Sequence, residues 1–67
     1  MNEQPALLTV REVADSMRVS TMTVYRLIRS GSLPAIRVGT HFRIRTSDLD
    51  QYLEAQTFQG GGAWPAA

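Results

Sequence analysis

The 67-residue sequence contains no cysteine, no lysine and a single histidine, His41. The absence of cysteine excludes disulfide bonds and thiolate metal sites, and one histidine cannot anchor a multidentate metal site. No histidine–carboxylate pair at helical spacing and no glycine-rich phosphate loop is present. The sequence therefore predicts a protein that is not an enzyme and needs no cofactor or metal.

Long apolar runs are also missing. The N-terminus "MNEQPALL" has neither a basic region nor a long apolar stretch, which predicts no signal peptide and no association with a membrane. Together with the lack of cysteine, this favours a cytoplasmic, nucleoid-associated location. The length allows one small domain, which we place at residues 7–56, with flexible segments at 1–6 and at 57–67, where "GGGAWPAA" lies.

Acidic residues are absent from the middle of the chain. Residues 16–47 hold six of the seven arginines and no Asp or Glu, whereas all six acids lie before or after this stretch. The net charge of +1 hides this segregation. Such sorting of charge is typical of a chain that presents one basic surface to an anionic partner.

Two helices are predicted before residue 31. The sequence "TVRE" from Thr9 to Glu12 is a capping box, and the apolar spacing that follows predicts a helix from about Val10 to Met17. Ser20 is a natural N-cap for a second helix of roughly ten residues, and Gly31 is a natural left-handed stop. At 100° per residue the second helix has an inward arc of Thr21, Val24, Leu27 and Ile28, and an outward arc of Met22, Tyr25, Arg26 and Arg29.

From residue 36 the apolar period changes to two. Ile36, Val38, Phe42 and Ile44 alternate with Arg37, Arg43 and Arg45. With the turn at "GTH", this predicts a β-hairpin with an apolar face on the helices and an arginine face toward solvent. A third helix follows, capped by Thr46 or Ser47, with a buried stripe of Leu49, Tyr52 and Leu53.

The predicted fold class is mainly α with a two-stranded β-hairpin, a winged helix-turn-helix. In such folds the second helix enters the major groove of duplex DNA. Arg26 suits bidentate pairing with guanine, and Met22 suits an apolar contact with a thymine methyl group. The hydroxyl side chains suit hydrogen bonds to phosphate oxygens. The wing arginines suit the adjacent minor groove or its phosphates. The residues expected to bind DNA are Ser20, Thr21, Met22, Thr23, Tyr25, Arg26, Arg29, Arg37, His41, Arg43 and Arg45.

Some of these side chains have a second interpretation. Tyr25 could instead cover the core, the wing arginines could pair with Asp48 or Asp50, and His41 could be only an exposed turn residue. Arg11 is expected to pair with Glu12, Asp15 or solvent. Arg18 is expected either at a phosphate or paired with Asp15.

The segments "LTVREVAD", "VSTMTVYRLIRSGSLPAIRVG" and "FRIRTSDLDQYL" resemble the excisionase-type, MerR-like helix-turn-helix family, which includes phage excisionases and small BldC-type regulators. The resemblance implies a winged helix-turn-helix that binds duplex DNA through Ser20, Thr23, Tyr25, Arg26, Arg43 and Arg45. The wing tip, with Thr40 and His41, is less basic than in many relatives. The resemblance also implies side-by-side self-association on repeated sites, and no small-molecule ligand is expected.

Three functions fit these observations. The first is a sequence-specific transcription regulator, and the second is an excisionase-like recombination directionality factor that uses the same surface. The third is a protein-interaction module that keeps the fold without the DNA contacts. The third would dilute the arginine face with acids or apolar residues, which the sequence does not do.

Overall fold

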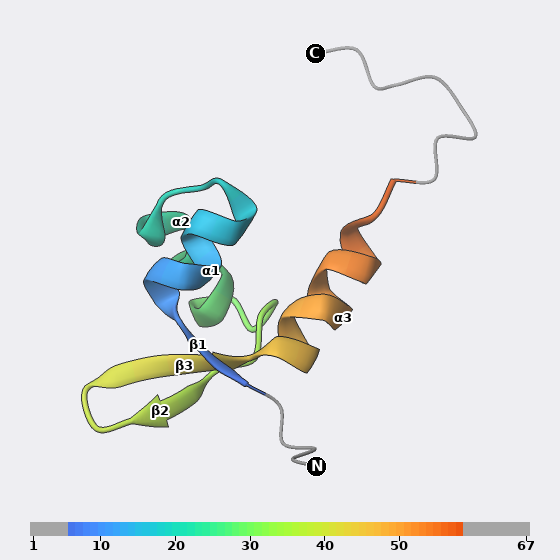
Figure 1. Ribbon diagram of the computed structural model, residues 1–67. Helices are drawn as coiled ribbons and strands as arrows, with labels where there is room; N and C mark the ends of the chain where they lie inside the picture. Colours follow the sequence, from blue (N-terminus) through green and yellow to red (C-terminus); the bar gives the residue numbers. More distant parts are fainter. Residues whose placement is uncertain (1–5, 59–67) are drawn as a thin grey trace.

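The computed structural model describes residues 6–58. The predicted flexible segments therefore lie mostly outside the described residues, and so does Trp64. Three helices and a small antiparallel sheet follow one another along the chain (Figure 1). The elements are β1 (Leu7–Thr9), α1 (Val10–Met17), α2 (Thr21–Arg29), β2 (Ile36–Val38), β3 (His41–Arg45) and α3 (Thr46–Gln56).

Local hydrogen bonds at α1 confirm the predicted capping box. The Glu12 amide donates to Thr9 Oγ1 at 3.0 Å, and the Thr9 amide donates to Glu12 Oε1 at 2.8 Å. The helix ends at Arg18, whose φ of 59° is left-handed, and the Val19 amide then donates to the Ala14 carbonyl at 2.9 Å. This pattern of a left-handed residue and a six-to-one hydrogen bond ends the helix sharply and turns the chain into α2.

The predicted bounds of α2 are confirmed. Ser20 is the N-cap, and its Oγ accepts the Thr23 amide at 3.2 Å. Gly31 has a φ of 83°, the left-handed conformation expected of the residue that stops the helix. The two caps leave nine helical residues, Thr21–Arg29, between α1 and the wing.

The sheet has three strands, in the order β1-β3-β2. The prediction of a two-stranded hairpin was incomplete, because Leu7–Thr9 pairs antiparallel with Arg43–Arg45. Three residues are too few to show an alternation of their own, and the last of them also serves as the cap of α1. The added strand ties the start of the chain to the centre of the wing.

The register of the hairpin differs from the predicted one. Only Gly39 and Thr40 form the turn, so Val38 pairs with His41 and Arg37 pairs with Phe42. Residues directly opposite each other share a face, and a shift of one residue moves every side chain of a strand to the other face. Arg37 therefore lies on the same face as Phe42. The predicted single apolar face was wrong for β2, whose Val38 is 50% exposed.

The two faces of the sheet carry different side chains. The inner face carries Leu8, Phe42 and Ile44, which pack with the helical core, and also Arg37 near the tip. The outer face carries Leu7, Thr9, Ile36, Val38, His41, Arg43 and Arg45. The wing arginines are thus divided between two faces, not gathered on one as predicted.

The core takes side chains from every helix, from β3 and from the segment that joins α2 to β2. Its buried members are Val10, Val13, Ala14, Val24, Leu33, Ile44 and Leu49. Thr21, expected on the inward arc of α2, is exposed. Within residues 6–58 no helix combines the length and apolarity needed to cross a membrane.

The third helix is less well anchored than predicted. Its N-cap is Arg45, which forms no side-chain capping bond, so neither Thr46 nor Ser47 caps it. Leu49 is buried and Tyr52 half-buried, but Leu53 is 40% exposed. In Figure 1, α3 leads away from the sheet and the other two helices toward the end of the described chain.

Candidate nucleic-acid interface

The outward face of α2 is basic and free of acids. Arg26 and Arg29 are exposed there beside Met22, which is 63% exposed, and Tyr25, which is 42% exposed. Neither arginine forms an ion pair within residues 6–58. Surface arginines usually have acidic neighbours on a solvated helix, so this face offers two uncompensated guanidinium groups to an anion.

Hydroxyl side chains gather at the N-terminus of α2. Ser20 Oγ and Thr23 Oγ1 lie 3.2 Å apart and share a hydrogen bond, while Ser20 also caps the helix. Thr21 is exposed beside them and Thr23 is half-buried. The hydroxyls of Ser20 and Thr23 therefore stabilise the N-terminus of α2 through their hydrogen bonds.

The three wing arginines have different surroundings. Arg37 Nε donates to the Gly39 carbonyl at 3.2 Å and Arg43 Nη1 to the Phe42 carbonyl at 3.0 Å, and neither forms an ion pair within residues 6–58. Arg45 Nη1 lies 3.3 Å from Asp48 Oδ2, the one ion pair within the described part of the chain. For Arg45 the second interpretation, a wing arginine paired with Asp48, is therefore confirmed.

An aromatic pair joins α2 to the wing. The ring centroids of Tyr25 and Phe42 are 6.3 Å apart with an interplanar angle of 63°, an edge-to-face arrangement. Such pairs are worth about 0.5–1.5 kcal/mol beyond the area they bury. The contact links Tyr25 on the outward face of α2 to Phe42 on the inner face of β3.

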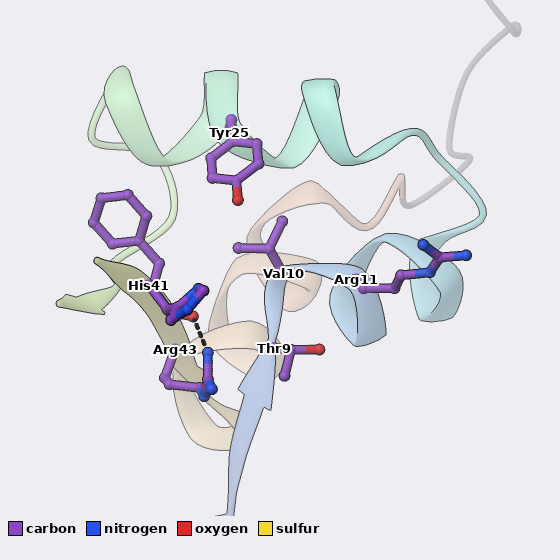
Figure 2. A pocket seen from close by; sticks show the side chains of 7 residues that line it. Thr9, Val10, Arg11, Tyr25, His41 and Arg43 are labelled. Carbon is purple, nitrogen blue, oxygen red and sulfur yellow. Dashed lines mark hydrogen bonds between the residues drawn. The ribbon is translucent and has the colours of Figure 1, made fainter. Parts of the chain in front are cut away.

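A hollow of about 240 Å³ opens beside this pair (Figure 2). Its walls are Thr9, Val10, Arg11, Tyr25, His41, Phe42 and Arg43. Of the residues predicted to bind DNA, the hollow brings together Tyr25, His41 and Arg43. The other eight do not line it.

Arg11 was not predicted as a site residue, although it lines the hollow. It forms no ion pair with Glu12 or Asp15 and is exposed, so of the three expected partners it has solvent. Arg18 likewise forms no ion pair with Asp15, and only its backbone amide donates to the Asp15 carbonyl at 3.2 Å. The sequence held one signal for Arg11, a cation in the first turn of a helix, where it opposes the helix dipole.

A second hollow, of about 370 Å³, lies between α3 and the segment that joins α2 to β2. Its one charged wall residue is Asp48, and the others include Ser32, Gln51 and Gln56. Residues 6–58 contain no group of three or more His, Cys, Asp or Glu side chains able to hold a metal ion. The basic and aromatic surface of α2 and the wing is therefore the site with a distinct chemistry.

Known proteins share this sequence pattern. "Putative DNA-binding protein Rv0500A" of Mycobacterium tuberculosis is 54% identical over 55 residues, covering 82% of this chain and 70% of that protein. "Uncharacterized protein YvgK" of Bacillus subtilis is 50% identical over 52 residues, which are 78% of this chain and only 17% of that protein. "Uncharacterized protein Rv2310" of Mycobacterium tuberculosis is 43% identical over 53 residues, 79% of this chain and 46% of that protein.

The family match covers the whole described fold. The model of a helix-turn-helix domain matches residues 7–57, from the start of β1 to the residue after α3. This range includes both helices of the motif, the three-stranded wing and the third helix. The chain therefore belongs to the helix-turn-helix domain family.

Proposed function

We propose that this chain is a sequence-specific duplex DNA-binding protein, a small transcriptional regulator of the MerR-like and BldC-like type. The observation that carries the proposal is the outward face of α2, where Arg26 and Arg29 stand without acidic partners within residues 6–58. The Mycobacterium tuberculosis relative named "Putative DNA-binding protein Rv0500A" supports it. Binding of chromosomal DNA also implies a cytoplasmic, nucleoid-associated location.

In this mode α2 enters the major groove. Arg26 lies in the middle of the helix on its exposed face and pairs bidentately with O6 and N7 of a guanine, worth about 1–3 kcal/mol of discrimination. Met22, one turn earlier, packs on a thymine methyl group. Arg29 lies nearly one turn later and contacts the sugar-phosphate backbone.

Other groups position the protein without reading sequence. The hydroxyls of Ser20, Thr21 and Thr23 at the start of α2 meet phosphate oxygens, as does the Tyr25 hydroxyl. From the wing, Arg37, His41 and Arg43 reach the neighbouring backbone and minor groove. Arg45 contributes least, because Asp48 already compensates part of its charge.

The DNA-binding unit is residues 7–56, and copies of it lie side by side where target sites repeat. One such unit covers about one half-site. An excisionase-like directionality factor would use the same surface, so the sites that the protein occupies separate the two functions. A protein-interaction module does not account for an arginine face left without compensating acids.

Selection of fragmented genomic DNA from the source organism tests the proposal. The purified chain is incubated with the fragments at near-physiological salt, and the bound fraction is sequenced. We expect promoter regions that share a motif, with fixed spacing between repeats where copies assemble side by side. Enrichment at a single integration end would instead identify a recombination factor.

The Arg26→Ala variant serves as the matched control in the same selection. It should relax the preference at one base pair of the motif while keeping the rest. No enrichment over input by the unaltered chain would contradict sequence-specific binding.

A further inference from the structure

We propose that the hollow between α2 and β3 holds one phosphate of the DNA backbone, and that Arg11 is a ligand of that phosphate. The inference rests on the proposed function, because it names a contact within that interface. It adds a contribution from α1, an element outside the second helix and the wing.

The walls of the hollow carry the chemistry that a phosphate diester needs. His41 and Arg43 supply nitrogen donors from β3, and the Tyr25 hydroxyl from α2 has no partner within residues 6–58. Arg11 lines the hollow from α1, with its guanidinium pointing away from His41 and Arg43 in Figure 2. No acidic side chain lines the hollow. The nearest acid in sequence, Glu12, is engaged through Oε1 by the Thr9 amide at 2.8 Å.

The hollow also lies where a backbone phosphate has to pass. When α2 occupies the major groove and the wing reaches the adjacent minor groove, the sugar-phosphate strand between the two grooves lies between α2 and the wing. Tyr25 bounds the hollow on the α2 side, and His41 and Arg43 bound it on the wing side (Figure 2). The Tyr25–Phe42 ring contact forms the wall between them.

The charge of Arg11 stands where it does not favour α1. A cation in the first turn of a helix opposes the helix dipole. Arg11 is exposed and has neither an ion pair nor a hydrogen-bond partner within the described residues. Its exposed side chain turns toward the hollow from the outward position drawn in Figure 2, and a bound phosphate supplies the favourable interaction that the helix does not.

The salt dependence of DNA binding tests the inference. Each neutralised phosphate contributes about −0.9 to the slope of log affinity against log salt. Arg11→Gln should therefore flatten the slope by roughly 0.9, weaken binding roughly five- to tenfold at 0.1 M salt, and leave the preferred motif unchanged. Arg11→Lys, which retains the charge, should keep the slope of the unaltered chain.

Gln51→Glu is the matched control, because it changes the net charge by the same −1 from an exposed position on α3. It should leave the slope unchanged. Equal flattening by Arg11→Gln and Gln51→Glu, or no flattening by Arg11→Gln, would overturn the role of Arg11 while the unaltered chain still binds DNA. Failure of the unaltered chain to bind would overturn the proposed function itself.

Two further arms identify the phosphate. Duplexes with a single neutral methylphosphonate, placed in turn along the site, should show one position at which Arg11→Gln costs nothing further. Free inorganic phosphate, compared with chloride at equal ionic strength, should displace the DNA no better. Stronger displacement by phosphate from the unaltered chain than from Arg11→Gln would assign the hollow to free phosphate instead of the DNA backbone.

Discussion

The second and third helices have similar lengths, but their exposed surfaces carry opposite charge. The exposed side of α2 carries Arg26 and Arg29 without compensating acids, and its N-terminus is capped by Ser20. By contrast, α3 carries Asp48, Asp50 and Glu54, lacks a side-chain cap, and holds Arg45 in an ion pair. The surface of α2 therefore has the charge that favours contact with a polyanion, and the surface of α3 does not. Leu49 and Tyr52 hold α3 against the core, whereas Leu53 is 40% exposed.

Truncating leucines in α3 gives the largest expected effects and tests how much of this helix is anchored. Leu49→Ala should lower the free energy of unfolding by about 2–5 kcal/mol, because a buried leucine is replaced by a cavity. Leu53 is 40% exposed, so Leu53→Ala should cost well under half as much. Urea unfolding followed by circular dichroism measures both. Equal losses would mean that the last turns of α3 pack as the sequence pattern predicted.

Removing one charge from each helix tests the difference in function. Arg26→Ala should weaken binding to the selected site by about 1–3 kcal/mol and relax specificity at one base pair. Asp50→Asn on α3 raises the net charge by one and should tighten binding slightly and equally for all sequences. Fluorescence anisotropy with the selected duplex and a scrambled duplex measures both. If Arg26→Ala weakens both duplexes equally, Arg26 is a phosphate contact only.

The helix ends provide a comparison of stability. Ser20→Ala removes the capping bond to the Thr23 amide and should cost about 1 kcal/mol. Ser47→Ala, in the first turn of α3, removes no capping bond and should change the stability by less than about 0.5 kcal/mol. Thermal unfolding at equal protein concentration compares the two variants. A loss at Ser47 as large as that at Ser20 would show that α3 is capped in solution.

The smallest expected effect concerns the ion pair that joins the wing to α3. Asp48→Asn breaks the 3.3 Å contact with Arg45, whose side chain is 49% exposed, so the loss of stability should not exceed about 1 kcal/mol. The same change frees the guanidinium of Arg45. The slope of log affinity against log salt should then steepen by up to about 0.9 if the freed arginine gains a phosphate contact. A slope flatter than that of the unaltered chain would contradict the idea that Arg45, once freed from Asp48, binds DNA.

The local elements of this fold could be read from the sequence, because short-range hydrogen bonds determine them. The capping box at Thr9, the cap at Ser20 and the left-handed Gly31 each depend on residues within a few positions. The register of the hairpin could not be read in this way. A turn of two residues instead of three moved Arg37 to the inner face and Val38 to the outer face, and the alternating pattern fits either choice.

The site was predictable only in part, for a similar reason. Helical periodicity placed Met22, Tyr25, Arg26 and Arg29 on one exposed face, as the structure has them. The hollow, however, joins Arg11 to residues fourteen or more positions away, through the pairing of β1 with β3. The prediction lacked β1, so nothing brought Arg11 toward the wing. Long-range pairing by very short strands leaves little trace in a single sequence.

The most direct test of the account is a nuclear magnetic resonance titration of the ¹⁵N-labelled chain with its selected duplex. The account predicts that the largest amide shift changes fall on residues 21–29 of α2, on 41–43 of β3 and on Arg11. The amide signals of residues 50–56 of α3 should not shift. Changes concentrated on α3, with α2 unaffected, would contradict the assignment of the uncompensated arginine face as the DNA-binding surface.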